Sequence, residues 1–297
     1  MSEAAQTWTV RTLLAWAKPW LERKGVDSPR LDAELLLARA LGCDRVRLYI
    51  DHDKPLGAEE LARFKALLTR RGEREPVAYI LGVKEFYGRP FAVGKGVFVP
   101  RPETEILVAL ALEALPAPGS GAELRALEQC AGAGAMGLSL CAERANLHVD
   151  LVELSPEAAK YAEANCQAHG GGRARVLVGD LFAPLGPPAP RYHAVVANPP
   201  YVPMGDSAHL PPDIMRHEPP VSLFGGEDGL DILKKLIAEA PAWLVPGGFF
   251  GVELDPTQAK GVRRLFEAAG FEKVRSVQDL AGMDRFVVGK QRRDGLD

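Results

Sequence analysis

The chain has 297 residues, of which 47% are hydrophobic and 25% are charged, and its formal net charge is −3 with a pI near 6.1. This balance excludes a disordered chain, and the length predicts two folded domains. The mildly acidic pI argues against stable nucleic-acid binding, because gripping phosphates normally needs a strongly basic face. No apolar run approaches the length of a membrane span, and residues 1–5 lack a signal-peptide pattern. We therefore expect a cytoplasmic protein with no membrane partner.

The four cysteines, Cys43, Cys130, Cys141 and Cys166, include no C-x-x-C pair. We interpret them as reduced thiols in the core or near a site, because metal-binding and redox cysteines are usually more closely spaced. The sequence therefore predicts neither a disulfide nor a metal site.

Apolar residues recur at helical spacing in three stretches between residues 7 and 74. Ser28 and Pro29 suit the N-cap and the first turn of one of these helices, and Gly42 suits its end. We expect residues 1–75 to form a small helical bundle that recognises the substrate. A bundle that only stabilises the protein is the alternative.

Alternating apolar side chains and glycine breaks characterise residues 76–100. The alternation runs through Phe91, Val93, Val97 and Val99, which is typical of paired strands. We expect this segment to form a β-hairpin that links the helical bundle to the remainder of the chain.

Strands and helices alternate in residues 101–297, beginning with a helix expected near Thr104. The expected strands lie at residues 126–128, 149–153, 175–178, 194–197, 249–253, around 274 and at 286–288. Such alternation predicts an α/β fold with a doubly wound parallel sheet, whose ligands bind at the carboxyl ends of the strands.

The stretch Asn198-Pro199-Pro200-Tyr201 directly follows the apolar run at 194–197. The prolines have a fixed φ and no N–H, so the Asn198 side-chain oxygen and the Pro199 carbonyl form two acceptors in nearly fixed geometry. Two such acceptors can hold both hydrogens of a planar NH2 group and direct its nitrogen at an electrophile. Asn-Pro-Pro is also a common loop sequence, so a structural role is the alternative.

This stretch resembles the N-P-P-Y signature of S-adenosylmethionine-dependent methyltransferases that act on planar nitrogen. The resemblance implies a Rossmann-like methyltransferase sheet and S-adenosylmethionine as the cofactor. We expect Asn198, Pro199 and Tyr201 to be catalytic, and these three together with Pro200 to bind the substrate.

A glycine-rich turn follows the strand at 126–128 and opens a helix. The residues expected to bind the cofactor there are Glu128, Cys130, Ala131, Gly132, Ala133 and Gly134. Glycines at such a turn let a ligand approach the backbone closely. A nicotinamide dinucleotide is an alternative ligand, since Gly137 provides part of its glycine spacing.

Acidic residues follow the next two strands and extend the expected cofactor site. Glu153 ends the second strand, where a carboxylate can accept hydrogen bonds from both ribose hydroxyls. Asp180 follows the third strand and is expected to bind the adenine amino group, while Leu181 or Phe182 packs on the face of the ring. Asn198, at the end of the next strand, is expected to complete the site.

Across nearly its whole length the chain resembles the peptide chain release factor N5-glutamine methyltransferases. The segments that carry this resemblance are 76–82, 86–88, 99–105, 198–201, 218–219, 225–230 and 279–285. Pro-Arg-Pro-Glu-Thr-Glu at 100–105 distinguishes that family from relatives that act on a ribosomal protein. The resemblance implies that the substrate is the glutamine of the Gly-Gly-Gln motif in class 1 release factors. We expect the protein to be a monomer.

The glycine-rich turn departs from the family pattern, which reads roughly Asp-Leu-Gly/Cys-Thr-Gly-Ser-Gly. Here Ala131 and Ala133 replace two hydroxyl residues, and Glu128 is one methylene longer than aspartate. Each lost hydrogen bond costs on the order of 1 kcal/mol, so cofactor affinity falls while the fold survives. An inactive scaffold that binds release factors is therefore an alternative, as is a methyltransferase of exocyclic amines in DNA or RNA.

Overall fold

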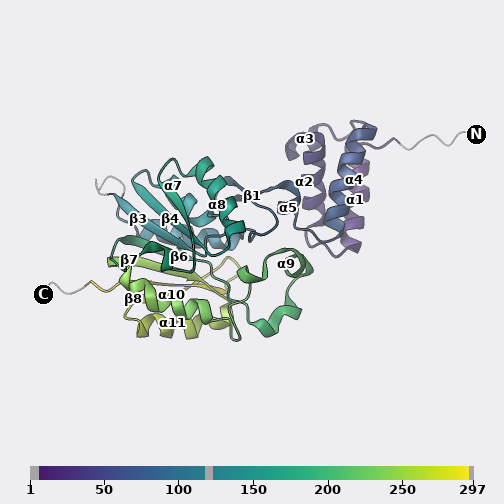
Figure 1. Ribbon diagram of the computed structural model, residues 1–297. Helices are drawn as coiled ribbons and strands as arrows, with labels where there is room; N and C mark the ends of the chain where they lie inside the picture. The colour runs from purple at the N-terminus through teal and green to yellow at the C-terminus, as the bar shows by residue number, and fades with distance from the viewer. Residues whose placement is uncertain (1–6, 118–122, 294–297) are drawn as a thin grey trace, which may run out of the picture. The chain divides into compact units, whose positions relative to one another are not determined.

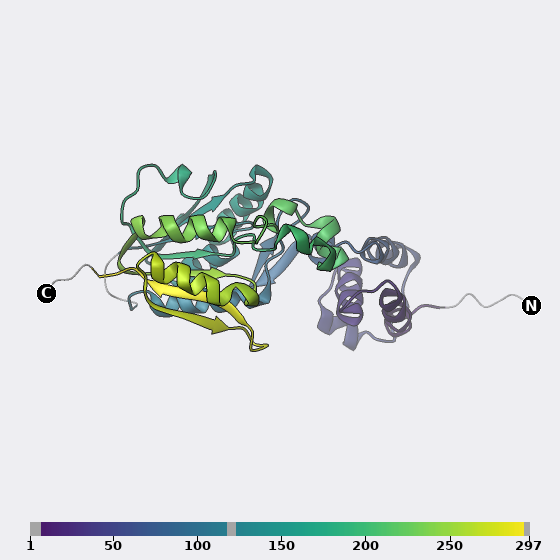
Figure 2. The ribbon, with the colours of Figure 1, turned by 90° about the horizontal axis from the view of Figure 1, so that it is seen from below.

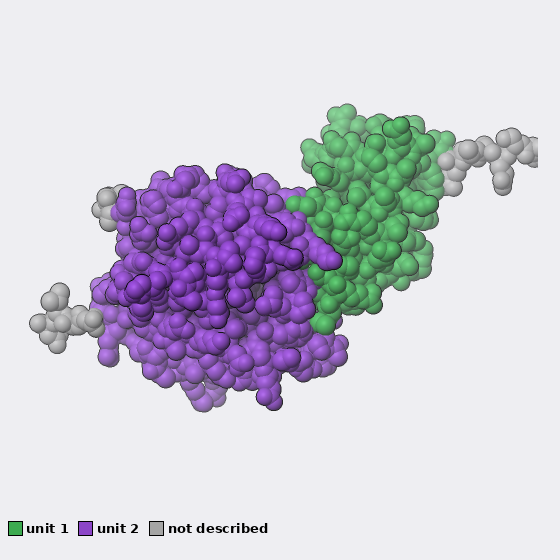
Figure 3. Space-filling model, in the orientation of Figure 1, with its two compact units in different colours: residues 1–82, 211–217 green, residues 83–210, 218–297 purple. Residues whose placement is uncertain are grey.

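The computed structural model describes residues 7–117 and 123–293. The chain forms two compact units, one of residues 1–82 and 211–217 and the other of residues 83–210 and 218–297 (Figure 3). The segment 211–217 thus joins the first unit, although its neighbours on both sides belong to the second. The hairpin expected as a link is part of the second unit.

The first unit is helical. Its helices are α1 (Val10–Arg23), α2 (Pro29–Leu41), α3 (Arg45–Ile50), α4 (Ala58–Gly72), α5 (Val77–Leu81) and α9 (Pro212–His217). Leu21, Leu36 and Phe64 lie in its buried core. Helix α2 begins after Ser28 and ends at Gly42, whose left-handed φ of 66° terminates the helix, so both predicted ends are confirmed.

A buried ion pair ties α9 to the helices of the first unit. The Arg71 guanidinium lies 2.6 Å from an Asp32 carboxylate oxygen and 2.8 Å from an Asp213 carboxylate oxygen. Burial raises the pKa of Asp32, and the Arg71 charge opposes that rise. Arg71 pairs with both acids and Arg74 also pairs with Asp213, so these contacts hold residues 211–217 within this unit.

The second unit is built on a mixed sheet (Figure 1). Its strands are β1 (Val83–Phe86), β2 (Arg89–Ala92), β3 (Leu124–Gln129), β4 (Leu147–Glu153), β5 (Ala174–Val178), β6 (Tyr192–Ala197), β7 (Leu244–Glu253), β8 (Glu272–Gln278) and β9 (Asp284–Lys290). Its helices are α6 (Glu105–Ala114), α7 (Ala135–Glu143), α8 (Pro156–His169), α10 (Asp231–Glu239) and α11 (Ala259–Ala268). The large sheet has seven strands in the order β5-β4-β3-β6-β7-β9-β8.

Helices cover both faces of the large sheet, as the views in Figure 1 and Figure 2 show for α7 and α8 on one face and α10 and α11 on the other. Leu107 and Met136 belong to the core on the α7 face, and Leu236 and Phe266 to the core on the α11 face. Strands that are buried on both faces need nearly continuous apolar runs, which explains residues such as 194–197. The predicted α/β fold is confirmed.

Two details differ from the predictions. Strand β9 is antiparallel to β7 and β8 is antiparallel to β9, so the sheet is parallel only from β5 to β7. The hairpin pairs β1 with β2 through Tyr87 and Gly88, both at positive φ, and it ends at Ala92. The alternation beyond it reflects burial of Val93, Val97 and Val99 outside a strand. No helix in the described part of the chain is long and apolar enough to span a membrane.

Candidate active site

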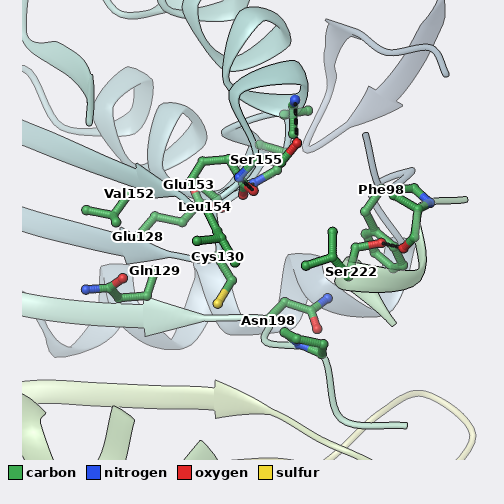
Figure 4. A pocket seen from close by; sticks show the side chains of 18 of the residues that line it. Phe98, Glu128, Gln129, Cys130, Val152, Glu153, Leu154, Ser155, Asn198 and Ser222 are labelled. Carbon is green, nitrogen blue, oxygen red and sulfur yellow. Dashed lines mark hydrogen bonds between the residues drawn. The ribbon is translucent and has the colours of Figure 1, made fainter. Parts of the chain in front are cut away.

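The carboxyl ends of β3, β4 and β6 lie side by side in register. Gln129, the last residue of β3, pairs with Val152 on one side and with Ala197 on the other. The residues that follow these positions therefore meet at one edge of the sheet, as expected for parallel strands. A cavity opens there, and Figure 4 shows Cys130, Glu153 and Asn198 around it.

Most of the predicted site residues line this cavity. They are Glu128, Cys130, Ala131, Gly132, Ala133, Glu153, Asp180, Leu181, Asn198 and Pro200. Three predicted residues are not among the described residues that line the cavity: Gly134, Pro199 and Tyr201. The cavity thus gathers groups from four strand ends, while three predicted residues lie outside its wall.

The two glycines of the β3–α7 turn have different roles. Gly132 has a φ of +56°, and a Cβ there would meet only Val97, at 3.9 Å, so this position leaves the cavity open. Gly134 has a φ of +75°, and its Cβ would come within 2.9 Å of Leu151 on β4. Gly134 therefore permits α7 to pack against the sheet, which accounts for its absence from the cavity wall.

Glu128 is a buried carboxylate that supports the start of α7. Its Oε2 accepts a hydrogen bond of 2.7 Å from the Gly137 N–H. Burial raises the pKa of Glu128 to about 8, although the backbone donors of Gly137 and Met136 oppose this shift. This carboxylate satisfies a backbone donor in the first turn of α7.

Glu153 accepts backbone hydrogen bonds from two segments, the β3–α7 turn and the residues that follow β4. Its Oε2 accepts from the Gly132 N–H at 2.7 Å, and its Oε1 accepts from the Ser155 N–H at 2.8 Å. Burial raises the pKa of Glu153. Each carboxylate oxygen has a second lone pair, so Glu153 remains able to accept hydrogen bonds from a ligand in the cavity.

Asn198 follows β6 and is held by the segment that precedes α6. Its Nδ2 donates to Thr104 Oγ1 at 3.3 Å, and Thr104 Oγ1 donates to Glu253 Oε2 at 2.5 Å. One hydrogen of the NH2 group is bound to Thr104, and the carboxamide oxygen is the acceptor left for a ligand. Asn198 lies at the cavity edge near Ser222 (Figure 4).

Tyr201 faces the interior instead of the cavity. Its hydroxyl donates to Glu253 Oε1 at 3.4 Å, and its ring packs against the core on the α11 face. Burial raises the pKa of this hydroxyl. Tyr201 therefore contributes through Glu253 and through packing, and its predicted contact with substrate remains a prediction.

Several wall residues were not predicted from the sequence. Phe98, Pro100, Thr104, Ser222 and Ile232 line the cavity, and none of them is among the predicted site residues. The sequence predicts Thr104 only as a helix start, although its segment carries part of the family resemblance. Glu253 is the last residue of β7, just as Glu153 is the last residue of β4. An acidic residue at the end of an expected strand is the signal by which the sequence could have indicated Glu253.

One ion pair joins two segments of the wall. Arg101 Nη2 donates to Glu218 Oε1 at 2.6 Å, and the Arg101 guanidinium lies 4.6 Å from the centre of the Phe98 ring. Within residues 7–117 and 123–293 no group of three or more histidine, cysteine or acidic side chains could hold a metal ion.

Comparison with known proteins supports this architecture. The family described as Methyltransferase small domain matches residues 94–210, and the one described as PrmC N-terminal domain matches residues 12–82. A Thermus thermophilus 16S rRNA N2 G1207 methyltransferase, solved with AdoMet and guanosine, has a TM-score of 0.50 and 20% identity, covering 71% of this chain and 50% of that one. The fold and its cavity define an α/β methyltransferase.

Full-length relatives specify the family. The release factor glutamine methyltransferase of Geobacter sulfurreducens is 41% identical over 290 residues, which cover 98% of this chain and 99% of that protein. The chain belongs to the release factor glutamine methyltransferases. The Deinococcus radiodurans member is 39% identical over 96% of this chain and 99% of its own length. A release factor-specific protein-(glutamine-N5) methyltransferase structure from Alicyclobacillus acidocaldarius has 29% identity and a TM-score of 0.39, covering 68% of this chain and 99% of that one.

Proposed function

We propose that this protein transfers the methyl group of S-adenosylmethionine to the side-chain nitrogen of the glutamine in the Gly-Gly-Gln motif of a class 1 release factor. The observation that carries the proposal is that Asn198 and the open turn at Gly132 line one cavity. An amide acceptor therefore lies beside a backbone that a cofactor can approach. Family membership favours this reaction over methylation of a nucleic-acid amine and over an inactive scaffold.

The cavity residues suit S-adenosylmethionine. Gly132 leaves space that a side chain would fill, and Glu153 is fixed by two backbone donors with lone pairs to spare. Glu153 would hold the ribose hydroxyls, Asp180 the adenine amino group, and Leu181 the face of the ring. When bound, S-adenosylmethionine supplies an electrophilic methyl group on a sulfonium.

The chain's own contribution to the reaction is the positioning of a weak nucleophile. The nitrogen lone pair of a glutamine amide is delocalised into its carbonyl. We assign the two amide hydrogens to Asn198 Oδ1, which lines the cavity, and to the carbonyl of the adjoining Pro199, although Pro199 itself is not part of the wall. These two hydrogen bonds localise the lone pair on nitrogen and direct it toward the cofactor side. Positioning and preorganised electrostatics of this kind supply several kcal/mol. A strong general base is not needed, because the methylated nitrogen loses a proton readily.

The helical unit and the charge of the chain bear on which partners the protein binds. The helical unit is proposed to recognise the release factor, since it contains none of the cavity residues. The protein is proposed to act as a cytoplasmic monomer without stable nucleic-acid binding, in keeping with its acidic pI near 6.1.

A methyl-transfer assay with purified release factor and isotope-labelled S-adenosylmethionine tests the proposal. The expected result is label on the Gly-Gly-Gln glutamine by mass mapping, with none on a release factor in which that glutamine is alanine. Asn198→Ala is expected to bind S-adenosylmethionine normally and to lose turnover. Label on DNA or RNA, or near-normal turnover by Asn198→Ala, would overturn the proposal. No calorimetric heat with millimolar S-adenosylmethionine would favour the scaffold.

A further inference from the structure

A buried polar chain begins behind Asn198. Thr104 and Glu253 are 4% and 2% exposed, and their hydrogen bond is 2.5 Å long. Val252, the residue before Glu253, pairs with Ala197, the residue before Asn198, so the two polar side chains follow neighbouring strands at the same level. The three side chains thus run from the cavity wall into the core.

The hydrogen bonds in this chain have a defined direction. An ionised carboxylate is an acceptor only, so the Thr104 hydroxyl donates its single hydrogen to Glu253. The Thr104 oxygen can then only accept, and the amide group that it accepts from is the Asn198 NH2. The Asn198 oxygen is consequently the acceptor that the carboxamide offers to a ligand.

We propose that Thr104 and Glu253 are positioning residues that select the amide orientation in which Asn198 presents its oxygen to the substrate. The inference rests on the proposed function of Asn198. A carboxamide turned by half a rotation would present NH2 to the substrate NH2, and two donors cannot bond. Thr104 and Glu253 therefore determine whether Asn198 can accept a hydrogen bond from the substrate amide.

The charge on Glu253 is sensitive to its surroundings. Tyr201 donates to its Oε1, Arg285 from β9 contributes a positive charge, and Glu103 beside Thr104 contributes a negative one. Burial raises the pKa of Glu253 to about 7, and the Thr104 hydrogen bond and the Arg285 charge oppose that rise.

Protonation reverses the direction of the chain. A neutral Glu253 donates to the Thr104 oxygen, and the Thr104 hydroxyl then donates to Asn198, which favours the turned amide. Turnover is therefore expected to fall as the pH drops through about 7, the value to which burial raises the pKa of Glu253.

Steady-state kinetics with release factor test the positioning role. Thr104→Val keeps the shape of the side chain and removes the hydroxyl, and its kcat is expected to fall at least about tenfold. Its KM for release factor and its calorimetric Kd for S-adenosylmethionine are expected to stay within about twofold, because the hydrogen bonds of the lost hydroxyl go to Glu253 and Asn198 and the valine keeps the shape of this part of the cavity wall. Thr104→Ser restores the hydroxyl and is expected to recover kcat. A Thr104→Val enzyme with unchanged kcat, beside an inactive Asn198→Ala enzyme, would overturn this inference and leave the proposed function intact. An active Asn198→Ala enzyme would instead overturn the proposed function.

The pH profile provides the second readout. Glu253→Gln offers an acceptor to Thr104 and an amide NH2 to the Tyr201 oxygen, and it does not titrate. Its kcat is expected to lose the fall below pH 7 that the unmodified enzyme shows. This measurement decides the matter if Thr104→Val does not fold. An acid fall of the same size in Glu253→Gln would contradict the role of Glu253.

Discussion

Arg101 and Glu218 form an ion pair of 2.6 Å between the segment preceding α6 and the loop that contains Ser222. The Glu218 side chain is 1% exposed and that of Arg101 is 29% exposed. Residues beside both partners line the cavity, so this pair keeps two walls of the site together.

Arg101→Ala is expected to weaken ligand binding. The substitution takes an ion-pair partner from a buried carboxylate, a change that costs up to about 3 kcal/mol when one side is partly exposed. The loop around Ser222 then loosens, and the calorimetric Kd for S-adenosylmethionine is expected to rise about tenfold or more. Arg101→Lys keeps the charge and serves as the control. Equal affinities in Arg101→Ala and the unmodified enzyme would show that the pair does not shape the cavity.

Alanine at the two turn glycines is expected to separate binding from stability. Gly132→Ala places a methyl group toward the cavity and should abolish cofactor binding. It should lower the free energy of unfolding by about 1 kcal/mol, because alanine disfavours the positive φ. Gly134→Ala meets the same backbone penalty, and its methyl group also collides with Leu151. Its free energy of unfolding should therefore fall several times as much as that of Gly132→Ala. Urea unfolding and calorimetry on both variants measure these effects. A Gly132→Ala protein that binds S-adenosylmethionine normally would move the site away from this turn.

Gln129→Leu is expected to stabilise the second unit. Gln129 is 0% exposed, and neither polar atom of its side chain has a hydrogen-bond partner among the described residues. Its amide points away from Asn198 (Figure 4). Burying such an amide without a partner costs about 1–3 kcal/mol, which leucine would recover. The free energy of unfolding from urea titration checks this, with Gln167→Leu, at an exposed position of α8, as a control for hydrophobicity. A less stable Gln129→Leu protein would show that the amide is satisfied by water.

Stability is expected to fall between about pH 4.5 and pH 8 because of Glu128. Burial raises the pKa of this carboxyl in the folded state to about 8 from the ordinary value of 4.5. In that window the folded state binds more protons than the unfolded state, so the free energy of unfolding decreases as the pH rises. Below the window both states are protonated, and above it both are ionised, so the effect of this group levels off.

Urea titrations at pH 5 and pH 8.5 measure this fall, and Glu128→Gln is expected to reduce it by a few kcal/mol at most. The remaining slope would belong to other buried acids such as Glu253, whose pKa is also raised. An unchanged slope in Glu128→Gln would place the titration elsewhere.

Local patterns predicted most of the secondary structure. Gly42 ends α2 because only a left-handed residue closes that helix turn easily, and this requirement is local to the sequence. The hairpin was extended too far because Val97 and Val99 are apolar for burial against the fold and not for strand pairing. The direction of β9 was not predicted, since alternation along a strand carries no information about the direction of its neighbour.

The sequence by itself determined the family, the α/β sheet and the strand ends at which Gly132, Glu153 and Asn198 lie, because these depend on short motifs. Only the tertiary structure decided that Gly134 packs against Leu151 and that Tyr201 faces Glu253. It also decided the partners of Asn198. Thr104 and Glu253 are 149 positions apart in the chain, and they meet because the segment before α6 packs across the ends of β6 and β7. A contact over such a separation is set by the packing of the whole sheet, and no local pattern encodes it.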